Sequence, residues 1–252
     1  MEVFKVRDLS LIDTGESYIV IAVDSFGGIG PKECDVVKLP VGKWGRAILR
    51  VPIMEVIASG AEPILVIDAL GVEYDPMGKE VIIAIREELS RLGYKDIPIT
   101  GSTEDNVPVK SSAAGVVVIG ESSKGKFYPG TSKEGDNLFV VGIPKVGKEI
   151  KEDLLEDQEI PDILDLILLR GLIGVHDILP VGSRGILYEA YEMAKNSHLN
   201  LILLDNVSID LRKSAGPSTC FLVSTSLTKR EIMGMVKPPV TLIGKLESGE
   251  KR

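Results

Sequence analysis

Short runs of apolar, often β-branched residues recur along this chain, and segments with a helical spacing of apolar residues separate several of them. In the first half, residues 17–23 and 64–70 predict buried strands, whereas residues 44–59 and 76–92 predict helices. We expect Pro52 to kink or restart the first helix. Such a mixture folds into a sheet with helices packed on it.

The same alternation resumes after a polar segment rich in Gly, Ser and Lys, residues 120–136. That composition is typical of an exposed connection between domains. We therefore predict an N-terminal domain over residues 1–120, a linker over 121–136 and a C-terminal α/β domain over 137–252. The remaining predicted strands are residues 97–100, 113–119, 137–142, 199–204, 219–224 and 240–246, and the remaining helices are residues 164–170, 185–196 and 227–235.

Composition excludes several classes of function. The 252 residues carry a formal net charge of −8, which argues against broad nucleic-acid binding. Two distant cysteines, Cys34 and Cys220, provide neither a disulfide framework nor a zinc site. The charged N-terminal segment is no signal peptide, and no apolar run is long enough to span a bilayer. We expect a soluble, cytoplasmic protein.

The first candidate for chemistry is the segment from Asp24 to Lys32, which follows the first predicted strand. Glycines such as Gly27 and Gly28 let backbone N–H groups approach an anion, while Asp24 suits a cation and Lys32 supplies a positive charge. We expect residues 26–31 to form a loop that favours phosphate and magnesium. A plain turn with a solvated lysine is the alternative, and the glycine spacing is not that of a dinucleotide fingerprint.

Residues 142–149 match the spacing G-x-x-x-x-G-K of a phosphate-binding loop but end in Glu149. Such a loop needs Ser or Thr at that position to bind magnesium, and Pro144 removes one backbone donor. A glutamate beside phosphate groups would also repel them. We therefore expect an ordinary turn that opens a helix, with no nucleotide bound near Lys148.

Two further polar segments follow or precede predicted elements. Residues 100–106 bring together oxygen ligands, among them Glu104 and Asp105, although an ordinary polar turn explains the same pattern. Residues 176–185 place a His-Asp pair and the run Gly-Ser-Arg-Gly before a helix, which favours an anion site at the helix N-terminus. A structural histidine and a solvated arginine are the alternative there.

Taken in order, these segments resemble the aminoimidazole ribonucleotide synthetase superfamily of ATP-using enzymes, which includes thiamine monophosphate kinase and selenophosphate synthetase. Residues 24–32 look like its Asp-Gly-Val-Gly-Thr-Lys segment, and residues 55–64 (EVIASGAEPI) resemble its Asp-Ile-Ala-Ala-Met-Gly-Ala-Glu-Pro-Leu helix end. Ile67-Asp68 and residues 101–105 are similar to its next strand and its Gly-Gly-Glu/Asp-Thr turn. The resemblance covers nearly the whole chain.

The resemblance implies a two-domain α+β fold, a homodimer in which the N-terminal sheets pair, and ATP with Mg²⁺ as cofactors. Carried over by position, Asp24, Glu55 and Asp68 bind the metal. The resemblance implies three further sets of site residues. The catalytic residues would be Asp24, Lys32, Glu104 and Asp105. The cofactor would be bound by Gly27, Gly28, Asp68, Ser102 and Thr103, and the substrate by His176, Asp177, Ser183 and Arg184. Glu55 replaces the usual Asp, and Ser102 replaces an acidic residue, so we expect a rearranged metal site.

Two kinds of enzyme chemistry agree with the resemblance. One is a kinase that transfers phosphate from ATP to a nucleoside-like hydroxyl; the turn Gly101-Ser-Thr-Glu resembles the α-ribazole kinases of cobalamin salvage. The other is a ring-closing synthetase that phosphorylates an amide oxygen. A non-catalytic ATP-binding relative is a third alternative. All three bind small molecules, and none implies a nucleic-acid or membrane partner.

Overall fold

A computed structural model describes residues 2–150, 154 and 156–249. The chain divides into two compact units. The first unit contains the residues up to Ile57 together with Ala61–Lys124; the second contains Ala58–Gly60, Gly125–Ile150 and the residues from Leu154 onward. Within the described residues, no helix has the length and apolar character needed to cross a membrane.

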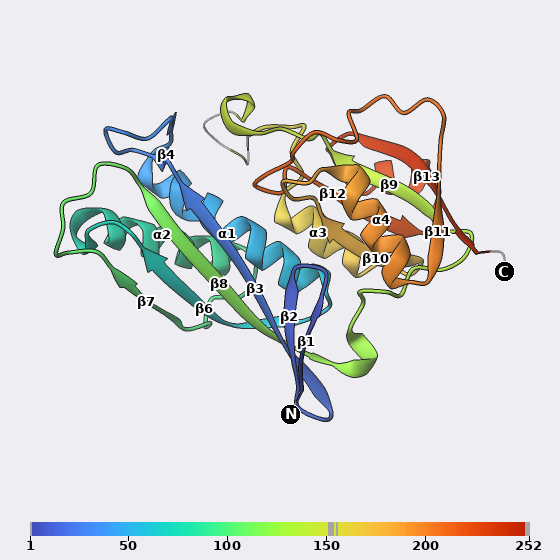
Figure 1. The fold of residues 1–252 in the computed structure, drawn as a ribbon, viewed down its shortest axis with the longest axis horizontal. Helices are drawn as coiled ribbons and strands as arrows, with labels where there is room; N and C mark the ends of the chain where they lie inside the picture. The colour runs from blue at the N-terminus through green and yellow to red at the C-terminus, as the bar shows by residue number, and fades with distance from the viewer. Residues whose placement is uncertain (1, 151–153, 155, 250–252) are drawn as a thin grey trace. The chain divides into compact units, whose positions relative to one another are not determined.

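The first unit is built on a six-stranded sheet with the order β1-β2-β3-β8-β6-β7 (Figure 1). Its strands are β1 (Glu2–Val6), β2 (Leu9–Asp13), β3 (Ser17–Gly27), β8 (Ala113–Ser123), β6 (Glu62–Leu70) and β7 (Ile99–Thr103). Neighbouring strands are antiparallel except β6 and β7, which are parallel. Two short strands, β4 (Ile29–Gly30) and β5 (Val37–Lys38), pair separately beyond β3.

The two faces of this sheet differ in burial. Residues on one face, such as Val20, Val66 and Val118, are fully buried, whereas alternate residues such as Val23 are exposed. Period-two alternation of this kind is typical of a sheet with one covered face. The helices of this unit are α1 (Val41–Ala58) and α2 (Lys79–Arg91), and a Cβ at Gly45 would collide with Val81 and Ala84, so the two helices pack closely.

Three details of the first unit differ from the sequence predictions. The helix α1 continues through Pro52 as one element of 18 residues, so of the two expected effects, a kink or a restart, the restart does not occur. A turn at Tyr74–Gly78, in which Asp75 has an extended backbone (φ −116°, ψ 121°), precedes α2, which begins three residues after Pro76. The strand β3 extends to Gly27, and β4 adds a further pair, so residues 26–31 are not loop throughout.

The strand β3 also bears on how two copies of the chain would meet. The resemblance implies sheets that pair across subunits, and the apolar residues 17–23 are a candidate for the strand that would join them. However, β3 lies inside the sheet and is hydrogen-bonded to β2 on one side and β8 on the other. Its edges are therefore not available, and the edge strands of this sheet are β1 and β7.

The second unit contains a five-stranded antiparallel sheet with the order β10-β12-β9-β13-β11. Its strands are β9 (Asn137–Gly142), β10 (Val175–Pro180), β11 (Leu199–Leu203), β12 (Cys220–Thr225) and β13 (Val240–Ser248). The helices are α3 (Ile163–Arg170), α4 (Ile186–Asn196) and α5 (Lys229–Met233). Single 3-10 turns occur at Lys124–Lys126 and Gly147–Glu149.

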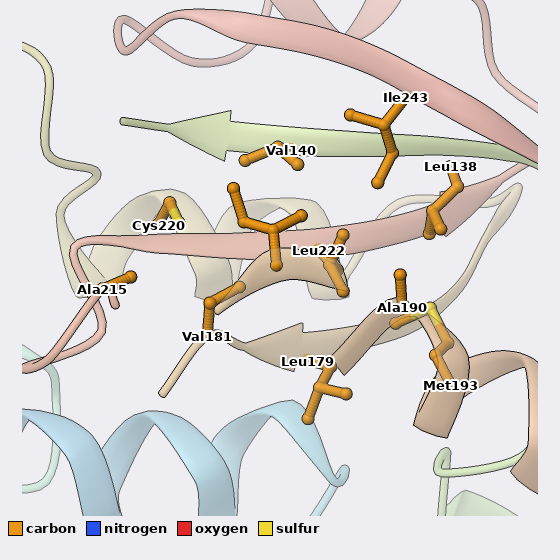
Figure 2. Packing of buried hydrophobic residues seen from close by; sticks show 11 residues of the cluster. Leu138, Val140, Leu179, Val181, Ala190, Met193, Ala215, Cys220, Leu222 and Ile243 are labelled. Carbon is orange, nitrogen blue, oxygen red and sulfur yellow. The ribbon is translucent and has the colours of Figure 1, made fainter. Parts of the chain in front are cut away.

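The core of the second unit forms where α4 packs on the sheet. Figure 2 shows side chains of β9, β10, β12 and β13 meeting Ala190 and Met193 of the helix. All of the cluster is at most 7% exposed. Because α4 contributes an apolar face to this cluster, the helix is anchored on the sheet.

The structure confirms the α+β fold class, and several elements match their predicted bounds closely. The strand β9 has its predicted residues, and α3 and α4 begin within one residue of the predicted start. The hairpin of β1 and β2 and the strand β10 were not predicted. The strand β8 continues to Ser123, into the segment that we expected to be a connection. The helix expected after residue 149 falls partly on residues 151–153 and 155, which lie outside the described residues.

Candidate functional site

Asp24 and Asp68 lie on one face of the first sheet, on either side of Val116. In the sheet register, Val116 of β8 is the partner of Asp24 on β3 and of Asp68 on β6. Residues directly opposite each other on neighbouring strands point to the same face. With one strand between them, the backbones of the two aspartates are about 10 Å apart. Both carboxylates therefore face the same side of the sheet.

Burial shapes the electrostatics of both carboxylates. Asp68 is 3% exposed, and burial raises its pKa to about 6. Burial also raises the pKa of Asp24, although a hydrogen bond from the backbone of Ser25 opposes this shift. An acid that is buried without a compensating positive charge favours its neutral form. A cation bound between the two aspartates would supply that charge.

Gly101 of β7 makes room for Asp68. The two residues are partners in the parallel ladder of β6 and β7. A Cβ at Gly101 would overlap both the carboxylate and the carbonyl oxygen of Asp68. Gly101 also belongs to the turn that resembles the family motif. A glycine is required there because any larger residue would push the Asp68 carboxylate out of place.

The third predicted metal ligand, Glu55, is a half-buried residue of α1. Among the described residues, no group of three or more His, Cys, Asp or Glu side chains gathers in a way that could hold a metal ion. Asp24 and Asp68 are thus two carboxylates on one face of the sheet, with Val116 on the strand between them. Mg²⁺ is often bound in this way, by one or two carboxylates with water and phosphate oxygens completing its octahedron.

The glycine-rich segment after β3 is organised by Asp35, which is 5% exposed. Its carboxylate accepts hydrogen bonds from the backbone N–H and the hydroxyl of Ser112, both at 2.7 Å, and from Ser111 and the N–H of Lys32. Burial alone would raise the pKa of Asp35, but these hydrogen bonds outweigh it and lower the pKa. Gly30 packs so tightly here that a Cβ would collide with Ser112 and Asp35.

Gly27 and Gly28, which the sequence predicts to bind phosphate, begin this segment. Gly27 is the last residue of β3, and apart from its own chain neighbours no heavy atom of the described residues lies within 4 Å of a Cβ built on either glycine. The N–H of Gly28 donates to the carbonyl of Ser112, while its own carbonyl accepts from Val36 and Val37. Open space beside the two glycines is compatible with a ligand that approaches the backbone.

Lys32 projects from this segment toward the loop after β6. Its ammonium forms an ion pair of 2.5 Å with Glu73, and the Lys32 side chain is 16% exposed. The sequence predicts a role for Lys32 but not for Glu73, which lies 41 residues away in the chain. The pair joins the glycine-rich segment to the end of β6.

The turn after β7 holds the other predicted residues of the first unit. Ser102 and Thr103 belong to the strand itself, and Thr103 donates a hydrogen bond of 2.6 Å to Asp105. Asp105 also accepts from the N–H of Tyr74, and the two bonds lower its pKa. Glu104 accepts from the backbone of the two residues that follow Asp105. Both acids thereby shape a turn that lies against the loop of Glu73.

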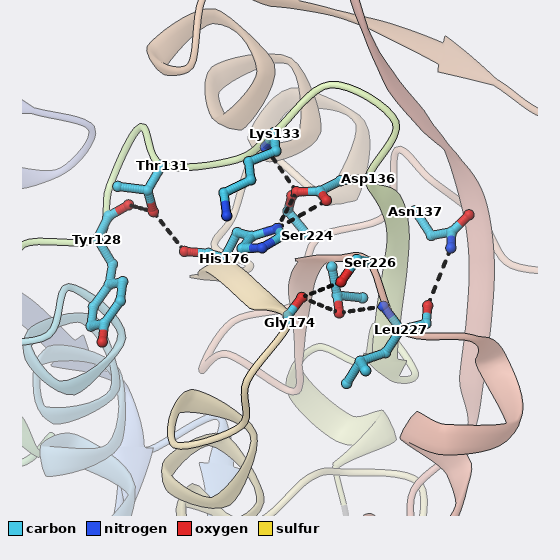
Figure 3. Close-up of polar contacts among 11 residues, drawn as sticks. Tyr128, Thr131, Lys133, Asp136, Asn137, Gly174, His176, Ser224, Ser226 and Leu227 are labelled. Carbon is cyan, nitrogen blue, oxygen red and sulfur yellow. Dashed lines mark hydrogen bonds and ion pairs between the residues drawn. The ribbon is translucent and has the colours of Figure 1, made fainter.

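In the second unit, His176 and Asp177 are part of the strand β10 rather than of a loop before a helix. The Nδ1 of His176 lies 2.8 Å from the carboxylate of Asp136, which also accepts from the hydroxyl of Ser224 and the N–H of Lys133 (Figure 3). Asp177 is fully buried, and its carboxylate accepts from the N–H of Gly130. Both side chains therefore fasten segment 130–136 to the sheet.

Ser183 and Arg184 lie at the N-terminus of α4 and are exposed. The Arg184 guanidinium stacks on the ring of Tyr188, 4.5 Å from its centroid. Gly185, with φ of 82°, allows the sharp entry into the helix, and a Cβ there would collide with Arg212 and Lys213. The loop presents a serine hydroxyl and a cation to solvent at a helix N-terminus, which favours anions.

Residues 142–149 do not form a phosphate-binding loop that leads into an α-helix. Lys145 is buried and forms ion pairs of 2.7 Å with Asp157 and Glu159. Glu149 is paired with Lys213, and Lys148 is exposed. The segment contains only a 3-10 turn at Gly147–Glu149. Lys145 and Glu149 are thus engaged with neighbouring side chains, whereas Lys148 faces solvent.

Sequence reasoning missed Asp35, Glu73 and Asp136, although each organises a part of the candidate site. Asp35 contacts a serine 77 residues away, and Asp136 contacts Ser224 at a separation of 88 residues. Local spacing carries no signal for contacts of that range. The one available clue was the presence of isolated acids beside Gly-rich segments, which often cap or brace such loops.

Comparisons with known proteins find relatives by structure but not by sequence. No protein-family model matches the chain, and no curated protein shows significant sequence similarity to it. Solved structures do match. Thiamine-monophosphate kinase from Stenotrophomonas maltophilia superimposes with a TM-score of 0.65 at 14% identity, covering 98% of this chain and 89% of that one.

Two further structures extend the comparison. The Aquifex aeolicus thiamine-monophosphate kinase, solved with AMPPCP and TMP, matches with a TM-score of 0.62 at 14% identity over 96% of this chain and 85% of that one. Escherichia coli HypE, a hydrogenase maturation protein, gives 0.64 at 18% identity over 91% and 80%. The chain therefore shares the fold of these thiamine-monophosphate kinases and of HypE, which agrees with the fold that its sequence motifs predict.

Proposed function

We propose that this chain is an ATP-dependent phosphotransferase that acts on a small molecule. The observation that carries the proposal is the pair of aspartates, Asp24 and Asp68, which flank Val116 on one sheet face and whose pKa values burial raises. A fold shared with a kinase that binds AMPPCP supports the nucleotide as the ligand.

The residues present fit Mg²⁺ bound to a nucleotide. Mg²⁺ would neutralise phosphate charge, and Asp24 and Asp68 would hold it, with Glu55 as a more distant third acid. Gly27 and Gly28 leave open space in which a ligand can approach the backbone, although the Gly28 N–H already donates to Ser112. Lys32 places a positive charge next to this segment, at a position fixed by Glu73. Ser102 and Thr103 end the neighbouring strand and complete the nucleotide side of the proposed site.

We propose a nucleoside-like hydroxyl as the phosphate acceptor, with α-ribazole as the specific candidate. In-line transfer needs a carboxylate that orients the attacking hydroxyl and positive charge around the transferred group. Glu104 or Asp105 would supply the carboxylate, and Lys32 part of the charge. In the second unit, Ser183 and Arg184 are the residues that the resemblance implies for the substrate, while His176 and Asp177 brace the strand from which that loop departs.

The test is a panel of nucleosides, α-ribazole among them, and amide precursors, incubated with Mg-ATP and scored by mass. Added phosphate on a hydroxyl supports the kinase, whereas loss of water with ring closure identifies synthetase chemistry. Binding of ATP without any product would favour a non-catalytic relative. Lys148→Ala is a control that keeps activity within about threefold, because an exposed lysine contributes little.

We also propose that the chain forms a homodimer through the open face of the first sheet. Because β3 is not an edge strand, the contact would use side chains rather than a shared sheet. The open face carries the apolar residues Ile19, Ile21, Val23, Leu65, Ile67, Val117 and Ile119, which are exposed or half-buried. An apolar face of this kind is typical of an interface.

A further inference from the structure

The ammonium of Lys32 is fixed in place by contacts at both ends of the residue. The backbone N–H of Lys32 donates to Asp35 at 2.8 Å, and its carbonyl accepts from the Nζ of Lys38 at 2.5 Å. The Nζ of Lys32 donates to Oε2 of Glu73. Hydrogen bonds therefore hold both the backbone and the side chain of Lys32 in position.

Glu73 leaves part of that ammonium open. An ammonium carries three N–H donors, and within the described part of the chain the ion pair with Glu73 uses one of them. The Lys32 side chain is 16% exposed, so it is not sealed from solvent. A phosphate oxygen could thus be bound while the ion pair persists.

The local charge around Lys32 is nevertheless not positive. Burial opposes ionisation of Glu73, but the hydrogen bond and the charge of Lys32 outweigh it and lower the pKa of Glu73. Asp105 is close enough to Glu73 to act on it electrostatically and is itself stabilised as an anion. Two cations, Lys32 and Lys38, and three anions, Asp35, Glu73 and Asp105, therefore lie around the point where the glycine-rich segment approaches the ends of β6 and β7.

We infer that Glu73 sets the charge selectivity of the nucleotide site. By neutralising Lys32, Glu73 makes the site bind a nucleotide as its magnesium complex and reject the metal-free nucleotide. Mg²⁺ cancels two negative charges of the triphosphate, so repulsion from Glu73 acts more strongly on the metal-free form. The inference rests on the proposed function, because it takes Lys32 to contact phosphate.

The test compares two affinities for the analogue AMPPCP, one with Mg²⁺ and one with EDTA, by titration calorimetry at constant ionic strength. Glu73→Gln keeps the shape of the side chain and removes its charge, and we expect the preference for the magnesium complex to fall about three- to tenfold. Lys32→Met removes the opposite charge and should raise the preference. Two variants with opposite expected signs keep the test decisive if one of them fails to fold.

Asp75→Asn is the matched control. Asp75 lies on the same loop and is also paired with a lysine, Lys79, but its side chain is 67% exposed. This variant should keep the wild-type preference, because solvent screens its charge.

If Glu73→Gln or Lys32→Met left the preference for Mg-AMPPCP over metal-free AMPPCP unchanged, the inference would be wrong. The ion pair would then be only a structural link between the two loops, and the proposed nucleotide site would still stand. An equal fall in Asp75→Asn would overturn it as well, because general surface charge would then explain the effect. If the wild-type chain bound AMPPCP in neither condition, the proposed function itself would fail and take this inference with it.

Discussion

At the scale of single residues, burial of the Asp68 carboxylate lowers the stability of the folded chain at neutral pH. Burial raises its pKa to about 6, so the folded chain binds the proton more tightly than the unfolded chain does. The resulting penalty is fully present above pH 6 and fades as the pH falls toward the unfolded value of 3.8. A buried acid that weakens the fold while it faces a candidate ligand site is typical of functional residues.

Asp68→Asn should therefore stabilise the metal-free protein at pH 8 by about 1–3 kcal/mol, and the gain should vanish near pH 4. The same variant should lose at least about tenfold in activity with Mg-ATP. Urea unfolding in EDTA at both pH values measures the first effect. A variant that is less stable than the wild type at pH 8 would show that Asp68 has a favourable partner in the fold.

Gly101 gives a second residue-scale prediction. Gly101→Ala places a methyl group where the Asp68 carboxylate lies, so we expect a loss of about 1–3 kcal/mol in stability and at least about tenfold weaker nucleotide binding. Gly115→Ala on β8 is the control, because its nearest neighbour is 4.0 Å from the added atom. If both variants bound AMPPCP equally well, the position of Asp68 would not matter to the ligand.

At the scale of elements, the glycine-rich segment depends on Asp35. Its lowered pKa means that the carboxylate contributes stability above the unfolded value of 3.8, and that this contribution is lost as the pH falls through the lower folded value. Asp35→Asn should destabilise the protein by about 2–3 kcal/mol at pH 7, because serine and backbone donors lose an anionic acceptor. The difference from wild type should shrink below pH 4.

Unfolding in urea at pH 7 and at pH 3.5 measures this dependence. Asp75→Asn, an exposed acid, serves as the control at both pH values. A difference between Asp35→Asn and wild type that is equal at the two pH values would indicate a packing defect rather than the loss of a charged acceptor.

The elements also show what a sequence of this kind can reveal. The strand β9 and the helix α4 were predicted accurately, because their apolar residues follow a local period. The strand β10 was missed because His176 and Asp177 look polar, although Asp136 and Gly130 satisfy them inside the fold. The strand β3 is longer than predicted because it pairs with β2 on one side and β8 on the other. The pairing with β8 depends on residues far along the chain.

The candidate site divides in the same way. Motif resemblance identified Asp24, Asp68 and Lys32 as residues of interest from short segments. The motifs did not identify Glu73, because its role depends on an ion pair between two loops that are distant in the sequence. Long-range ion pairs leave no periodic trace in a sequence, so the charge balance around Lys32 needs the structure.

At the scale of the whole molecule, the open face of the first sheet predicts an assembly. Val23 is 62% exposed on that face, beside an aspartate that points to the other face. Val23→Asp should convert a dimer to a monomer, because it places a charge in an apolar contact. Light scattering at micromolar concentration measures the mass. A wild-type chain that is monomeric there, and active, would contradict the dimer.

The central claim is that Asp24 and Asp68 together hold a magnesium nucleotide on the first unit. Calorimetric titration of the wild-type chain and of Asp24→Asn with Mg-AMPPCP tests it most directly, since it needs no knowledge of the acceptor. We predict saturable binding to the wild type and an affinity at least about tenfold lower for a correctly folded Asp24→Asn. Equal affinity in the two proteins would contradict the account.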